Sequence, residues 1–366
     1  MPPGSAGKRW SLGGDRGTPC SRSLCLHLRS SRSRLLGVAL LLVAPLLGCI
    51  QIELLGGGRG KLVETVVHVQ GGEGTGAARF LLVDVDGIIH LGDQSSLLGT
   101  KESTVARIRE QLDAARRDAS IRGVLLRIDS PGGGATASDV IYSELLRFKR
   151  DRAVPIVAHF LGMAASGGYY VAMAADELVA EPTTVTGSIG VIFAGVNLSG
   201  LMERWGIEDQ TLTAGRYKDA GSMLRPQTRE DREILQSVID DLYARFRTVV
   251  GRGRPELSPG RIDTLADGRL YSAKQALENG LIDRVGDIEE AVGRLQERAG
   301  VERSVVVSYH RPSEWRRNLY TRSRDEGVPL EHSEPRRMPL EGLTPGFLYL
   351  WPGASQLPWL SVLSTP

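Results

Sequence analysis

The sequence predicts an α/β fold built around a mostly parallel sheet. Apolar stretches typical of buried strands, such as 80–85 and 123–128, alternate with stretches in which apolar residues recur at helical spacing, such as 104–117. Parallel strands need a long crossover connection, usually a helix, and such crossovers are almost always right-handed. With 366 residues, of which 41% are hydrophobic, the chain is long enough for one large domain or two ordinary ones.

The further elements are expected in a regular order along the chain. After the strand at 123–128 we expect a helix at 137–149, a strand at 155–158, a helix at 169–174, short strands at 178–180 and 190–193, a helix at 198–205 and an extended segment at 210–213. A long amphipathic helix begins at about Thr228, whose side chain suits an N-cap and is followed by acids in the first turn. Shorter helices begin at Ser272 and Ile288, and a strand is expected at 304–308.

The first 49 residues have the pattern of an export signal. Residues 1–34 contain seven Lys or Arg and one acid, and residues 35–50 are apolar apart from two glycines and Pro45. This apolar run is shorter than the roughly 20 residues that span a bilayer. It ends in Leu-Leu-Gly-Cys at 46–49, which resembles the lipobox of bacterial lipoproteins, and the resemblance implies a lipid on Cys49. A plain membrane anchor with an incidental cysteine is the alternative.

Composition divides the rest of the chain into three parts. Glycines at 56–58 and within 71–76 indicate a tether over 50–78, ahead of a folded domain over 79–310. The extension over 311–366 is expected to be partly disordered, because its first part is rich in Arg, Glu, Ser and Pro. Its end is dense in aromatic residues, which predicts a strap on its own domain, on a neighbouring subunit or at a membrane interface.

Charge and cysteine content exclude several kinds of site. The net charge of +2 gives no overall indication of a nucleic-acid binder. All three cysteines (Cys20, Cys25 and Cys49) precede the folded domain, so that domain has neither a disulfide framework nor a thiolate metal site. No metal or cofactor is expected.

Ser166 is the most informative residue of the domain. It stands between small residues, after the strand at 155–158 and before the helix at 169–174. A serine at such a turn places its hydroxyl at a helix N-terminus, where backbone N–H groups favour developing negative charge. Gly167 and Gly168 allow a substrate to approach closely. The alternative is a simple N-cap serine, which this segment taken alone favours.

A glycine-rich turn at 129–134 follows the strand at 123–128. Its backbone N–H groups could bind a phosphate or an oxyanion. The turn has neither the Gly-Lys-Ser/Thr of a Walker loop nor the glycine spacing of a dinucleotide site. An oxyanion hole is the functional interpretation that remains, and an ordinary strand-to-helix turn is the alternative.

A nucleophilic Ser166 needs a base, and the histidines are poorly placed to supply one. His68 falls in the expected tether, whereas His310 and His332 fall at or beyond the end of the domain. His90 remains open, as does His159, which lies only seven residues before Ser166.

Lys218 is the other candidate base, in a loop at 215–221. A lysine becomes a base near neutral pH when it is buried without a counter-ion, because burial favours the neutral amine. Ser188 is a candidate to orient that amine towards Ser166. The alternative for Lys218 is an exposed surface lysine, the usual location of this residue type.

Four motifs, taken together and in order, resemble the SppA-type signal peptide peptidases of family S49. The motifs are Asp-Ser-Pro-Gly-Gly at 129–133, Ala-Ser-Gly-Gly-Tyr-Tyr at 165–170, Thr-Gly-Ser-Ile-Gly-Val at 186–191 and Tyr-Lys-Asp-Ala-Gly at 217–221. The resemblance covers about 80–300. It implies a Clp/crotonase-like core of repeated ββα units with a helical C-terminal part.

The resemblance also implies roles for individual residues. Ser166 would be the nucleophile and Lys218 the general base, with Ser188 bonded to the lysine. The backbone N–H groups of Gly133 and Gly167 would form the oxyanion hole. The family's short form implies an exported ring of subunits on the periplasmic face of a bacterial membrane, which cleaves signal peptides and other membrane-derived peptides.

Two other functions remain open on the sequence. A crotonase-like acyl-CoA enzyme would share the core and the glycine turn, although an export signal conflicts with a cytoplasmic cofactor. A non-catalytic membrane scaffold would share the fold, although it would not need both Ser166 and Lys218. One departure bears on mechanism: Asp219 adjoins the expected base and would hold its proton unless the carboxylate points away.

Overall fold

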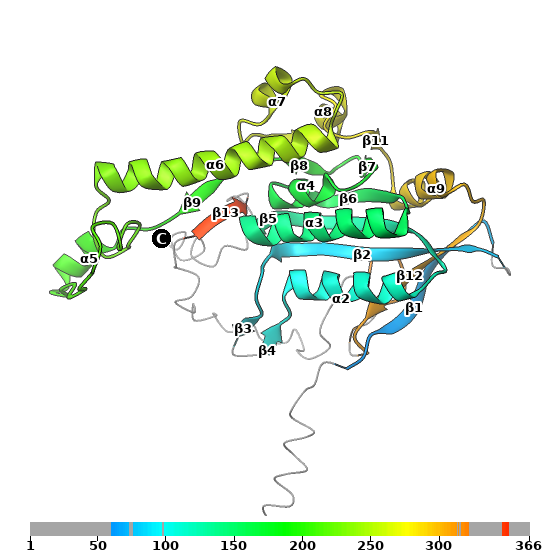
Figure 1. Cartoon of the computed structure of the whole chain (residues 1–366), viewed down its shortest axis with the longest axis horizontal. Coiled ribbons are helices and arrows are strands. Elements are labelled where there is room, and N and C mark those ends of the chain that lie inside the picture. The colour runs from blue at the N-terminus through cyan, green and yellow to red at the C-terminus, as the bar shows by residue number, and fades with distance from the viewer. Residues whose placement is uncertain are drawn as a thin grey trace, which may run out of the picture. The chain divides into compact units, whose positions relative to one another are not determined.

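The computed structural model describes residues 60–72, 76–96, 99–312, 314, 316–321 and 346–350 (Figure 1). The expected export signal, with Cys49, lies outside the described residues. So do the first part of the expected tether and most of the C-terminal extension. The folded body begins at residue 60.

One large sheet organises this body. Its main path runs in the order β1 (Val63–Gln70), β12 (Ser304–His310), β2 (Ala78–Ile89), β5 (Ile121–Gly134), β6 (Ile156–Ala165), β7 (Glu177–Ala180) and β11 (Arg284–Val285). Neighbouring strands from β12 to β11 run parallel, whereas β1 runs antiparallel to β12. The predicted α/β class with a mostly parallel sheet is therefore confirmed. A separate short hairpin joins β3 (Gln94–Ser96) to β4 (Gly99–Lys101).

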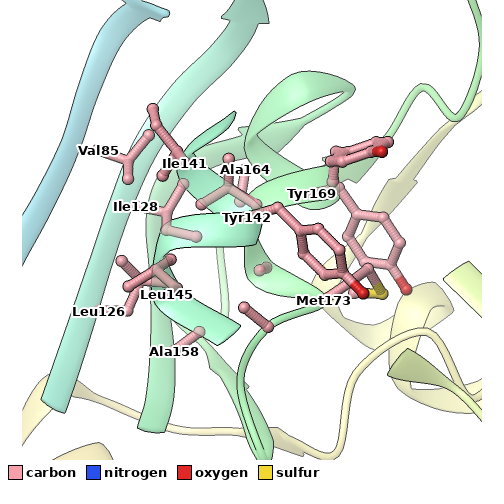
Figure 2. Close-up of a cluster of buried hydrophobic side chains, with 14 of the residues drawn as sticks. Val85, Leu126, Ile128, Ile141, Tyr142, Leu145, Ala158, Ala164, Tyr169 and Met173 are labelled. Atoms are coloured by element: carbon pink, nitrogen blue, oxygen red, sulfur yellow. The ribbon is translucent and has the colours of Figure 1, made fainter. Parts of the chain in front are cut away.

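Helices cover both faces of this sheet. On one face lie α2 (Thr104–Arg117), α3 (Ala135–Arg152) and α4 (Gly167–Ala172), and on the other lies α9 (Ile288–Ala299). Successive side chains of β2 point to opposite faces of the sheet, which explains the two layers. Leu81 and Val83 belong to the hydrophobic cluster on one face, and Phe80 and Leu82 belong to the cluster on the other. Figure 2 shows part of the first cluster, including side chains of α3 against those of β5. The residues labelled there include Ile141, Tyr142, Leu145, Leu126 and Ile128.

The remaining elements follow β7 in the sequence. They are β8 (Val185–Gly187), β9 (Ile192–Ala194), α5 (Ser199–Arg204), α6 (Arg229–Gly253), α7 (Pro259–Leu265), β10 (Leu270–Ser272), α8 (Ala273–Glu278) and β13 (Gly346–Leu350). The long helix α6 begins as predicted, because Thr228 and Asp231 form a reciprocal capping box. In Figure 1, α5 and the first turns of α6 stand away from the sheet.

One expectation about the limits of the body needs correction. The tether expected over 50–78 contains β1, which pairs with β12 along its length. The stretch 210–213, expected to be extended, joins no sheet. Parts of the extension over 311–366 pack on the body, one of the alternatives expected for its end, since Arg316 and Tyr349 are both buried. The cause is the same for β1 and for the extension: their partners lie far away in the sequence.

A buried ion cluster joins the start of that extension to the sheet. Asp84 of β2 accepts a hydrogen bond from Arg127 of β5 at 2.7 Å and is also bonded by Arg316. Arg127 in turn donates to the backbone carbonyl oxygen of Thr321 at 2.9 Å. Burial alone would raise the pKa of Asp84, but Arg127 and Arg316 outweigh that effect and lower it.

Replacing Asp84 by Asn is expected to lower the free energy of unfolding by about 3–5 kcal/mol, because two buried guanidinium groups lose their counter-charge. The difference from wild type is present at neutral pH and disappears as the pH falls through the lowered folded-state pKa of Asp84. Denaturant unfolding at several pH values measures both effects. Glu256→Gln, at an exposed position, serves as the control and should change stability by less than about 0.5 kcal/mol. An equal loss in the two variants contradicts the expectation.

Candidate active site

Ser166 lies where β6 ends and α4 begins, as the sequence predicted. Its side chain is buried, at 1% exposure. Its backbone N–H donates to the carbonyl oxygen of Gly187 at 2.8 Å, and its own carbonyl accepts from the N–H of Tyr170 at 2.9 Å. Ser166 occupies the N-cap position of α4, yet its side chain makes no capping hydrogen bond. The hydroxyl is therefore not used as a helix cap.

The backbone at Ser166 is strained. Its φ is 50° and its ψ is −112°, a conformation that residues with a side chain rarely adopt. Among the described residues, only Ser166, Ser188 and Ala153 combine a positive φ with a side chain. Such a conformation costs about 1–3 kcal/mol, and it persists only where the surrounding structure imposes it. Two of the three strained positions are thus serines predicted for the site.

Strand β8 brings Ser188 to the end of β6. Ala165 pairs with Gly187 in the parallel β6–β8 ladder, so Ser188 follows directly on the residue that anchors Ser166. The N–H of Ser188 donates to the carbonyl oxygen of Arg269 at 2.7 Å, and its side chain is 7% exposed. The predicted nucleophile and the predicted orienting serine therefore lie at neighbouring strand ends.

The glycine turn of β5 packs against Gly167, the residue that follows Ser166. A Cβ on Gly132, whose φ is 101°, would lie only 2.7 Å from the backbone nitrogen of Gly167. A Cβ on Gly167 would lie 3.2 Å from the Cα of Gly132. The two segments pack this closely because neither residue has a side chain. Gly133, the other predicted oxyanion residue, is the next residue of this turn and pairs with Ile89 of β2.

Two polar side chains hold this turn in place, and the sequence reasoning gave them no role. Ser130 donates to the carbonyl oxygen of Gly87 at 2.6 Å and accepts from the N–H of Gly132 at 3.1 Å. Asp129 accepts from the N–H of Met163 at 3.0 Å, which ties β5 to β6. Their position directly before a glycine run was the signal that could have identified them, because such residues often stabilise turns.

The described histidines give Ser166 no base. His159 is fully buried on β6, roughly 20 Å along the strand from Ser166 at the usual rise per residue. Burial lowers the pKa of His159 to about 4, so it is neutral at pH 7. His90 bonds to Thr104, His68 to Gln70 and His310 to Thr65. His332 lies outside the described residues.

Lys218 differs from the expectation of a buried base. It lies in the loop between α5 and α6 and is exposed, and its amine makes no hydrogen bond or ion pair with any residue that the structure describes. Asp219 does not neutralise it, because Arg225 binds that carboxylate at 2.6 and 2.9 Å. Arg225 also lowers the pKa of Asp219, chiefly through this hydrogen bond. The lysine amine thus has no counter-ion among the described residues, and it is exposed rather than buried.

Comparisons with known proteins identify the family. The family model for peptidase family S49 matches residues 148–302, and the model for Clp protease matches residues 85–184. A protein of Enterococcus faecium named signal peptide peptidase SppA is 35% identical, over 65% of this chain and 68% of its own length. Protease 4 of Haemophilus influenzae is 31% identical, over 63% of this chain but only 36% of its own length.

One solved structure gives a more distant match. A point mutant of ClpP1 from Listeria monocytogenes is 16% identical with a TM-score of 0.38, over 58% of this chain and 94% of the other. The Clp protease model, together with the parallel sheet and its helices, confirms the predicted Clp/crotonase-like class. The chain belongs to peptidase family S49, the SppA-type signal peptide peptidases, and is a serine-type peptidase.

Proposed function

We propose that the protein is a membrane-attached endopeptidase that hydrolyses signal peptides and other short membrane-derived peptides with a Ser166–Lys218 dyad. The observation that carries the proposal is the strained backbone of Ser166, whose neighbour Gly167 packs against a side-chain-free glycine turn. Strain of this kind is typical of a nucleophile held for attack. Backbone N–H groups beside it are typical of an oxyanion hole.

The reaction follows the usual course of acyl transfer. As the Oγ of Ser166 bonds to the carbonyl carbon of the substrate, the neutral amine of Lys218 takes the hydroxyl proton. The N–H groups of Gly133 and Gly167 hold the carbonyl oxygen, which becomes negative. The C–N bond then breaks and the leaving amine receives the proton. Water repeats the sequence, which releases the carboxylate and restores Ser166.

Assembly of subunits would supply the burial that Lys218 lacks. The segment that carries it also carries exposed apolar side chains, which we call the apolar arm: Val196, Leu201, Trp205, Ile207, Leu212 and Tyr217. Trp205 is 77% and Leu212 97% exposed, and α5 has no buried residue. An apolar surface of this kind is typical of an interface. We infer a homo-oligomeric ring in which the arm packs against a neighbouring copy and encloses Lys218.

Helix α6 supports the same assembly. The sequence places Leu235, Val238 and Phe246 on one apolar stripe of this helix. Phe246 is buried, whereas Val238 and the neighbouring Ile234 are more than a third exposed. The half of α6 nearest the apolar arm therefore presents apolar surface to whatever lies beside it.

Membrane attachment is proposed to come from a lipid on Cys49. No helix in the described part of the chain is long and apolar enough to cross a membrane. A diacylated cysteine would hold the catalytic body at the bilayer surface, because acyl chains insert with about 0.8 kcal/mol per buried CH₂. Released signal peptides lie in the same bilayer, which brings enzyme and substrate together.

Replacing Ser166 or Lys218 by Ala is expected to lower kcat/KM for a peptide substrate by about 10³-fold or more, because each removes a partner of one proton transfer. Ser120→Ala and Lys274→Ala, at exposed positions outside the site, are matched controls that should keep wild-type rates. A fluorophosphonate probe read by mass spectrometry should modify Ser166 in wild type and not in S166A. Wild-type rates in both the Ser166 and the Lys218 variant would contradict the proposed dyad.

Trp205→Ser combined with Leu212→Ser is expected to convert the ring to smaller species and to lower peptidase activity at least 10-fold, because the cover over Lys218 is lost. Light scattering after size-exclusion chromatography measures the mass. The control is Leu277→Ser, an exposed apolar residue on α8 away from the arm. Mixing S166A and K218A subunits then shows whether a dyad forms within one subunit or between two. An unchanged mass in the arm variant contradicts the proposed interface.

Cys49→Ser is expected to abolish incorporation of a labelled fatty acid and to release the peptidase from membranes in a sedimentation assay. Cys25→Ser, which alters a cysteine ahead of the expected cleavage point, should leave both unchanged. Mass spectrometry of the mature N-terminus identifies the modified residue directly. A wild-type N-terminus that does not begin at Cys49 rules out the lipoprotein assignment.

A further inference from the structure

The hydroxyl group of Ser138 lies against both backbone segments that we propose for the oxyanion hole. Ser138 belongs to the first turns of α3, and the residue is fully buried, at 0% exposure. Its Oγ donates to the carbonyl oxygen of Gly134 at 3.0 Å, and Gly134 directly follows Gly133. A Cβ on Gly167 would lie 2.5 Å from the same Oγ, a separation that real Cβ atoms essentially never show. One oxygen atom therefore packs between the glycine turn and Gly167.

The contact with Gly167 gives this serine more than a local role. A serine inside a helix commonly donates to the carbonyl group four residues earlier, and Ser138 makes that bond. The bond also holds the Oγ at a fixed place beside Gly167. Because Gly167 has no side chain, its backbone approaches α3 until it meets this oxygen. The Oγ of Ser138 thus sets how closely the two segments pack.

Helix α4 is attached to α3 at a second point, which does not involve Ser138. The hydroxyl of Tyr170 donates to the carboxylate of Asp139, and Arg245 of α6 donates to the same carboxylate at 2.8 Å. All six residues of α4 are buried as well. Loss of the Ser138 hydroxyl would therefore leave α4 in place, and its effect would be confined to Gly167 and the glycine turn.

We propose that Ser138 is a positioning residue that sets the separation of the Gly133 and Gly167 N–H groups. The proposal rests on the proposed peptidase function, in which these groups hold the substrate carbonyl oxygen as it becomes negative. Such donors act only when they lie about 2.7–3.1 Å from that oxygen. A misplacement of about 1 Å can lower the rate about 10²-fold. Ser138 acts through the backbone of Gly134 and Gly167, so it needs no contact with the substrate.

The first test replaces Ser138 by Ala and measures hydrolysis of a fluorogenic peptide that the wild-type protein cleaves. We expect kcat to fall about 10- to 100-fold and KM to change less than about 3-fold, because charge stabilisation in the transition state is lost while ground-state binding is kept. The pH dependence of kcat/KM should keep its apparent pKa values, because the base is untouched. Ser143→Ala, at a partly exposed position of the same helix, is the matched control and should keep wild-type values. A wild-type kcat in Ser138→Ala overturns the proposal.

The second test separates positioning from a purely structural role. A peptide aldehyde of the same sequence adds to the Ser166 hydroxyl, and the resulting oxyanion resembles that of the transition state. Its inhibition constant should rise in Ser138→Ala by the same factor by which kcat/KM falls. The inhibition constant of the carboxylate product peptide should stay the same. Equal weakening of both inhibitors indicates general damage to the site and overturns the positioning role. Thermal unfolding shows whether the variant is folded.

The third test asks whether Gly167 and the Ser138 hydroxyl share one space. Gly167→Ala should lower kcat about 100-fold or more, because the new methyl group overlaps the Oγ of Ser138 and displaces an oxyanion donor. Adding Ser138→Ala removes the overlap, so the double variant should be about 5-fold or more faster than Gly167→Ala alone. Additive losses contradict the proposed contact.

Failure of this proposal can be told from failure of the peptidase mechanism. If the fluorophosphonate probe leaves wild-type Ser166 unmodified and S166A keeps its activity, the mechanism itself is wrong. If Ser166 is modified and S166A is inactive, but Ser138→Ala keeps wild-type kcat and aldehyde affinity, the mechanism stands and the role assigned to Ser138 is overturned.

Discussion

The candidate site depends on one backbone hydrogen bond, from the N–H of Ser166 to the carbonyl oxygen of Gly187. This bond joins the ends of β6 and β8 and holds Ser166 at a positive φ that the isolated chain would avoid. The cost of that conformation is offset by the surrounding strands, which are themselves fixed by apolar layers on both faces. Ser166 is thus positioned by the sheet as a whole rather than by a local motif.

The sequence predicted those elements that are determined by neighbouring residues, such as the apolar spacing of a helix or the residue that caps it. The apolar spacing of 104–117 matches α2 residue for residue, and Thr228 caps α6 as its side chain suggested. The pattern failed to predict strands at β1 and β13, because the flanking glycines of β1 resemble a linker and the aromatic residues and prolines around β13 indicated a strap rather than a strand. Both are held as strands by partners far along the chain, β12 for the first and β5 for the second. Pairing of that kind leaves no periodicity in a single sequence.

The candidate site, like the fold, could be predicted only in part from the sequence. Motif order identified Ser166 and the glycine turn, and the structure brings them together. The surroundings of Lys218 could not be predicted, because a loop sequence does not reveal what covers it. Within one subunit the lysine is exposed beside exposed apolar residues. In the ring that we propose, burial of Lys218 and burial of that apolar surface would be a single event, so the proposed dyad would become active only where subunits meet.

Helix α6 has a consequence for how this sequence can vary. Its first turn, through Asp231 and Arg225, anchors the loop that carries Lys218, and Leu242 and Phe246 further along contact Tyr349. A straight helix turns by about 100° per residue, so one inserted or deleted residue between 231 and 242 would rotate one attachment away from the other. The length of the helix therefore fixes both the spacing and the relative rotation of the two attachments. Its length is expected to resist change even where its exposed side chains vary freely.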